Sequence, residues 1–165
     1  MRRLALALVL ALGLVFAPAA AQDRGPPRDA ALERLVGAWS GEGQVGGKDA
    51  LVFAGFTWAL GERFLALSFA RTGGGGAYEA QAYLRPRGGG RYGGTWLDST
   101  GEVTSFEARA EGDSLTLEWA HDVAGPERIV LSLEGPGRLV MTSFERRGTA
   151  WEPAGRLVLT REQGR

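Results

Sequence analysis

Side chains that could transfer a proton come close together in residues 92–99. Tyr92 carries a phenol, and Asp98 carries a carboxylate two positions after Trp96. Such groups act as general acids or bases when an apolar surrounding shifts their pKa toward the working pH. An Asp at the end of a strand also commonly starts a turn through its side chain, so both interpretations of Asp98 stay open. Further candidate carboxylates are Glu107, Glu118 and Asp122.

Metal and nucleophile chemistry find little support in the composition. The sequence has one histidine, His121, and no cysteine. Zinc sites draw most of their ligands from these two residue types, so no metal site is expected. An axial haem ligand would be a role for His121, but it stands beside Asp122 and just before an Ala-Gly-Pro turn, so haem is not expected as a cofactor. The glycine run 73–76 lacks the Gly-Lys-Ser/Thr that completes a phosphate loop.

Aromatic side chains suggest noncovalent binding of an apolar molecule. Trp96, Phe106 and Trp119 fall on three consecutive predicted strands, where hairpin connections would bring them to one wall of an interior. We expect a mainly apolar pocket of ~300–1,000 Å³ there. The alternative is that these rings only fill the core, and small residues such as Ala82 and Gly94 would be needed to leave room. The candidate ligand-binding residues are Trp58, Tyr83, Trp96, Phe106, Trp119 and His121.

The elements that must position these residues read as strands joined by tight turns. The chain contains 26 glycines, many clustered between runs of alternating apolar and polar residues. The predicted strands are Ala38–Val45, Leu51–Ala59, Glu62–Arg71, Ala77–Arg85, Arg91–Leu97, Glu102–Ala110, Ser114–Asp122, Glu127–Glu134, Arg138–Arg146 and Arg156–Arg161. A short helix capped by Asp29 and ended by Gly37 precedes them. We predict an all-β fold, a single antiparallel up-and-down β-barrel of about ten strands with a short N-terminal helix.

The first residues have the order of a secretory signal peptide. Arg2 and Arg3 form a basic start, Leu4–Phe16 is apolar, and Ala19–Ala21 offers a small-residue cleavage site. The apolar run is shorter than the ~20 residues that span a bilayer, so no stable membrane anchor is expected. We predict a signal peptide at 1–21, a flexible lead-in at 22–28 and one barrel domain at 29–165. The protein is then exported to a bacterial periplasm or the extracellular space.

The overall charge excludes some classes of partner. Lys+Arg and Asp+Glu both number 19, so no basic surface for nucleic acid or an anionic membrane is indicated. Apolar residues make up 44% and charged residues 23% of the chain, which are ordinary values for a globular domain. The oligomeric state is not indicated by the sequence.

The segment Gly37-Ala38-Trp39 resembles the Gly-x-Trp signature of the calycins, the lipocalin and fatty-acid-binding-protein superfamily. The resemblance implies a Trp that plugs the closed end of a barrel under a basic residue from the last strand, and Arg161 stands in that place. An arginine over an indole contributes ~0.5–2 kcal/mol. The stretch from Tyr83 through Trp96 to Ser99 is also similar to an exported bacterial domain family of unknown function with a calycin-like barrel. A ten-strand count is closer to fatty-acid-binding proteins and haem-binding nitrobindins than to eight-stranded lipocalins.

Three functions follow from these observations. The first is an exported barrel that binds a small apolar or amphipathic molecule. The second is a barrel enzyme, an isomerase or hydrolase that uses Asp98 or Tyr92 for proton transfer. The third is a structural or interaction module without a ligand. Of these, binding without catalysis is the interpretation that the sequence favours.

Overall fold

The structure is a computed structural model that describes residues 29–119 and 128–163. The predicted signal peptide and lead-in, and the candidates His121 and Asp122, lie outside the described residues. Among the residues described, no helix has the length and apolar character needed to span a bilayer.

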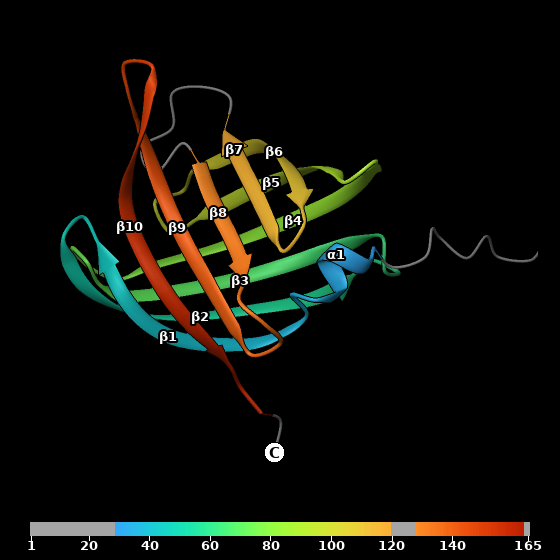
Figure 1. Cartoon of the computed structure of the whole chain (residues 1–165), viewed down its shortest axis with the longest axis horizontal. Coiled ribbons are helices and arrows are strands. Elements are labelled where there is room, and N and C mark those ends of the chain that lie inside the picture. The colour runs from blue at the N-terminus through green and yellow to red at the C-terminus, as the bar shows by residue number, and fades with distance from the viewer. Residues whose placement is uncertain (1–28, 120–127, 164–165) are drawn as a thin grey trace, which may run out of the picture.

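Ten antiparallel strands form one closed barrel behind a short helix, which confirms the predicted fold class (Figure 1). The order around the barrel is β1-β10-β9-β8-β7-β6-β5-β4-β3-β2, so sequence neighbours pair and β1 closes onto β10. The elements are α1 Ala30–Glu33, β1 Gly37–Val45, β2 Lys48–Ala59, β3 Phe64–Gly73, β4 Tyr78–Gly88, β5 Arg91–Asp98, β6 Val103–Glu111, β7 Ser114–Trp119, β8 Arg128–Leu133, β9 Arg138–Arg147 and β10 Ala150–Arg161.

Alternating side chains explain why these segments form a barrel with one buried face. On β7, Leu115, Leu117 and Trp119 are buried, whereas Glu118 between them is exposed. Side chains of a strand point alternately to the two faces of its sheet, so each strand sends one set inward. The inward sets of all ten strands, together with Leu32 of α1, build one core.

Several strand boundaries differ from the sequence prediction, among them the starts of β3 and β10. Glu62 was expected in a strand, but its φ of 65° places it in the turn before β3. Strand β10 begins at Ala150 rather than at Arg156. The pairing of β10 with β9 shifts register between Pro153 and Gly155. A bulge accommodates the missing proline N–H, so the strand continues through residues that sequence rules treat as breakers.

Strand β1 bends tightly against β10 because two of its glycines carry no side chain. A Cβ built on Gly41 would lie 2.0 Å from the carbonyl oxygen of Val158, and one on Gly43 would lie 2.0 Å from that of Arg156. Real Cβ atoms do not approach backbone oxygens so closely. These two glycines therefore permit the close approach of the strands that close the barrel.

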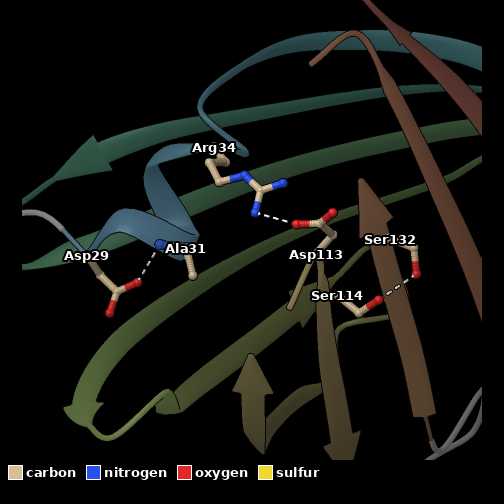
Figure 2. A network of polar contacts seen from close by, with 6 residues as sticks. All are labelled: Asp29, Ala31, Arg34, Asp113, Ser114 and Ser132. Atoms are coloured by element: carbon tan, nitrogen blue, oxygen red, sulfur yellow. Dashed lines mark hydrogen bonds and ion pairs between the residues drawn. The ribbon is translucent and has the colours of Figure 1, made fainter. Parts of the chain in front are cut away.

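Helix α1 covers the barrel end where the chain enters, which we call the base. The Asp29 carboxylate accepts hydrogen bonds from the backbone N–H groups of Ala31 and Leu32, at 3.0 and 3.2 Å, and so caps the helix as predicted. Arg34 donates to Asp113 in the β6–β7 turn at 2.7 Å (Figure 2). Side-chain hydrogen bonds therefore hold both ends of this single helical turn.

Arg161 and Trp39 seal the base. They are register partners on β10 and β1, and the guanidinium carbon lies 4.1 Å from the centroid of the indole ring. The same guanidinium donates hydrogen bonds to the carbonyl oxygens of Arg34, Val36 and Pro136. The Trp39 indole N–H donates to the Leu35 carbonyl at 2.8 Å. The expected stack is present, and it joins both chain-end strands to α1 and to the β8–β9 turn.

Removing this guanidinium should destabilise the barrel. We expect Arg161→Ala to lower the free energy of unfolding by ~2–4 kcal/mol, because the stack and several charged hydrogen bonds are lost together. Arg156→Ala, an exposed arginine of the same strand, should change it by less than ~0.5 kcal/mol. Urea denaturation followed by circular dichroism measures both. Equal stability of Arg161→Ala and the parent would contradict the role of the seal.

Candidate functional site

The barrel has two chemically different ends. The base carries α1 and the Arg161–Trp39 stack. The opposite end, which we call the mouth, is formed by the β1–β2, β3–β4, β5–β6 and β9–β10 connections. Tyr92 is the second residue of β5, at the base, and Asp98 ends β5 at the mouth, so the two residues are ~20 Å apart at the usual rise of a strand. The two candidates for proton transfer therefore belong to different sites.

Three predicted ligand-binding residues come together inside the barrel toward the mouth. The ring of Trp119 lies 5.5 Å from Trp96 in an edge-to-face arrangement and 5.5 Å from Phe106. Trp96 is 7% exposed and Trp119 is 9% exposed. A Cβ on Gly94 would meet the Phe106 ring at 2.2 Å, so the missing side chain is used to seat that ring. The cluster is compact and almost completely shielded from water.

A chain of hydrogen bonds leads from this cluster toward the mouth. The Trp96 indole N–H donates to the Tyr78 hydroxyl at 3.0 Å, and that hydroxyl donates to the Asp98 carboxylate at 3.0 Å. Asp98 also accepts from the backbone N–H of Thr100 at 2.9 Å and from its hydroxyl. The Arg71 guanidinium lies 5.4 Å from the centroid of the Tyr78 ring and donates to the carbonyls of the β3–β4 turn. An apolar wall therefore adjoins a polar group with defined donors and acceptors.

These contacts fix the charge states of the pair at neutral pH. Burial raises the pKa of Tyr78 to about 12, with the Trp96 hydrogen bond opposing this and Asp98 adding to it. For Asp98, partial burial favours the neutral acid, but hydrogen bonds from Thr100, Tyr78 and the Glu102 backbone outweigh it and lower the pKa. Tyr78 is therefore a neutral donor and Asp98 an anionic acceptor. The pKa of Tyr78 and the pKa of Asp98 are thus both shifted away from 7.

Other sequence candidates lie away from the mouth. The Trp58 indole donates to Glu33 of α1 at 2.6 Å, at the base. Tyr92 is 1% exposed and donates to Asp29 at 2.9 Å, and burial followed by this contact raises its pKa. Both residues hold the helix against the barrel. No contact of the described residues brings either one to the Trp96 cluster.

Tyr83 points away from the interior. Its neighbours in sequence, Ala82 and Leu84, are buried on the inner face of β4, so Tyr83 belongs to the outward set. The carboxylates Glu107 and Glu118 are also on the outer face, where they pair with Arg87 at 2.9 Å and with Arg128 at 2.5 Å. These residues are surface groups rather than parts of an internal site.

Tyr78 and Arg71 were not among the selected site residues, although the sequence contains a signal for both. Tyr78 stands two positions before Ala80 and four before Ala82, which places it in the inward set of β4. Arg71 follows Phe69 at the same spacing on β3. A polar residue at the end of an apolar alternation is the pattern that would have identified them.

Four hollows of 510 to 570 Å³ open along the described residues, and none of these four has Trp96, Phe106 or Trp119 in its lining. The predicted interior pocket thus stays a prediction, and a ligand that reaches this cluster must part its rings.

Within residues 29–119 and 128–163, no group of three or more His, Asp or Glu residues is arranged to hold a metal ion.

Comparisons with known proteins return structural likeness without a family. No family model and no curated protein sequence matches the chain. Among solved structures, EF1p2_mFAP2b bound to DFHBI is similar at a TM-score of 0.45 and 8% identity, covering 81% of this chain and 97% of that one. The S-type phycobiliprotein lyase CPES from Guillardia theta is similar at 0.45 and 9%, covering 81% and 92%. Likenesses this distant transfer neither ligand nor activity.

Acid should selectively weaken the contribution of Asp98. Its folded-state pKa is lowered, so its stabilising effect is present above the unfolded value of ~3.9 and is lost as the pH falls through the folded value. We expect Asp98→Asn to be less stable than the parent at about pH 7, with a difference that shrinks as the pH falls below the unfolded pKa of ~3.9 and the carboxylate takes up a proton. Urea denaturation at pH values on either side of this pKa measures the difference. A difference that stays constant with pH would contradict the assignment.

Proposed function

We propose that this protein binds a small amphipathic molecule at the mouth of its barrel. The observation that carries the proposal is the hydrogen-bond chain from Trp96 through Tyr78 to Asp98, placed against the aromatic cluster at the end that the Arg161–Trp39 stack does not seal. Ligand sites typically combine an apolar lining with a few placed polar groups. This end of the barrel supplies both.

The chemistry of the mouth indicates which parts of a ligand would go where. The rings of Trp96 and Trp119 offer apolar surface to the body of the molecule. The anionic Asp98 carboxylate accepts hydrogen bonds, so it suits a hydroxyl or amino group. The Tyr78 hydroxyl lies between the two regions and can donate to the ligand when it turns from Asp98. A molecule with an apolar body and a hydrogen-bond donor at one end fits this arrangement of aromatic rings, hydroxyl and carboxylate.

We further propose that binding takes place outside the cytoplasm. The support is the order of basic, apolar and small residues in the first 21 positions of the sequence. Cleavage after Ala21 would give a mature protein that begins at Gln22. N-terminal sequencing of the protein from its own host checks this, and secreted or periplasmic protein that still begins at Met1 would contradict it.

Ligand binding should change tryptophan fluorescence, because Trp96 and Trp119 are shielded and in contact with each other. We expect a saturable change when the purified protein is titrated with at least one of a set of fatty acids, retinoids and haem. Tyr78→Phe should weaken that binding by about 10-fold through the lost hydrogen bond.

Trp151→Phe serves as the control. This ring of β10 lies 4.0 Å from the guanidinium carbon of Arg128, which pairs with Glu118 on the outer face, so it is outside the Trp96 cluster. Its affinity for the same molecule should equal that of the parent. An absence of any fluorescence change with the whole set, or equal affinity of Tyr78→Phe and the parent, would count against the mouth as a binding site.

A further inference from the structure

Large apolar side chains lie uncovered on the outer face of the barrel. Phe53 is 60% exposed and Leu51 is 55% exposed, two positions apart on the same face of β2, and Leu97 of β5 is 37% exposed. Isolated exposed apolar residues are common on soluble proteins, whereas a group beside a hollow marks an interaction surface. The surroundings of Phe53 decide which of these applies.

The side chains next to Phe53 on the adjacent strands are small, so its ring borders a hollow. Its register partners are Ser40 on β1 and Ala70 on β3, and the next row pairs Gly55 with Ser68. A hollow of about 560 Å³ lies here across the outer faces of β2 to β5. We call it the outer groove, and its lining includes Phe53, Gly55, Ser68, Ala70, Gln81 and Leu97. An aromatic wall and a floor of small residues suit the insertion of an apolar side chain.

The charged residues that line the outer groove are all acidic. An adjoining hollow of about 510 Å³ contains Leu51. The charged residues that line the two hollows are Glu42, Asp49, Glu79, Asp98 and Glu162, and no lysine or arginine belongs to either lining. None of the ion pairs among the described residues involves these carboxylates. Such a surface attracts basic groups and repels acidic ones.

We propose that the outer groove docks an extended segment of a partner protein in which apolar side chains are flanked by lysine or arginine. Phe53 and Leu51 are ~6.8 Å apart along β2, which is the spacing of alternate side chains in an extended chain. The barrel is closed, so the described sheet has no free edge for strand addition. Recognition must therefore use the side chains on its outer face, with Phe53 as the aromatic anchor.

A second copy of this chain is a poorer occupant of the groove. Two-fold association through this face would place Glu79 and Glu162 of each copy close to the carboxylates of the other. Like charges brought together at an interface oppose association. A basic partner gains from the same carboxylates.

Selection of phage-displayed random peptides on the immobilised protein tests the proposal. We expect enriched peptides that combine an aromatic or branched apolar residue with flanking Lys or Arg. Their affinity, measured by fluorescence anisotropy, should fall at least ~10-fold in Phe53→Ser and in the double variant Glu79→Lys with Glu162→Lys.

Matched controls separate the groove from surface character in general. Leu60→Ser removes a side chain that is 69% exposed in the β2–β3 turn, and Glu145→Lys reverses an exposed charge on β9. Both should bind the peptides within about twofold of the parent.

Three results would overturn the proposal. One is the absence of a basic and apolar consensus among the enriched peptides. Another is equal peptide affinity of Phe53→Ser and the parent. The third is self-association of the parent in sedimentation velocity that Phe53→Ser abolishes and Leu60→Ser keeps, which would assign the groove to a second copy of the chain.

Discussion

The contact between Arg161 and Trp39 is the constraint on which the rest of the barrel depends. An up-and-down barrel has one closing pair, its first and last strands, and this stack lies across that pair. The guanidinium also satisfies carbonyl oxygens at the end of α1 and in the β8–β9 turn. A buried indole face and several carbonyls replace a carboxylate partner, so the cation closes the base without the burial of an acid. Gly41 then lets the two strand backbones approach closely.

Because the base is sealed, the two ends of the barrel interior differ. Apolar side chains fill the barrel above the seal, and near the mouth Tyr78 bridges Trp96 and Asp98. Each donor in that chain has an acceptor, which removes the cost of leaving these groups unpaired away from water. The outer face divides as well, because arginine–carboxylate pairs occupy much of the β6–β9 side while the groove beside Phe53 carries carboxylates alone. Interior and exterior thus present different chemical surfaces, and Asp98 borders both.

The strands and the seal could be predicted because each follows from local patterns. The alternation of apolar and polar residues predicts which side chains face the interior, and the glycine clusters predict the turns. The resemblance of Gly37-Ala38-Trp39 to the Gly-x-Trp signature predicts that Arg161 packs on Trp39. The extent of β10 could not be predicted, because Pro153 breaks a strand unless a bulge accommodates it, and the bulge depends on pairing with β9. The direction of Tyr83 was missed because a shift of one residue reverses the face. The partnership of Tyr78 with Asp98 depends on a register set by the β4–β5 turn, which lies far from either residue in sequence.

Native mass spectrometry of the protein purified from its own host tests most directly whether the mouth binds a molecule. The account predicts a reproducible additional mass on the parent protein, and its loss or marked reduction in Tyr78→Phe purified in the same way. The outer-face variant Phe53→Ser should retain the additional mass, because its side chain lies outside the barrel. A clean unliganded mass for the parent, or an additional mass that Tyr78→Phe keeps in full, would contradict the account.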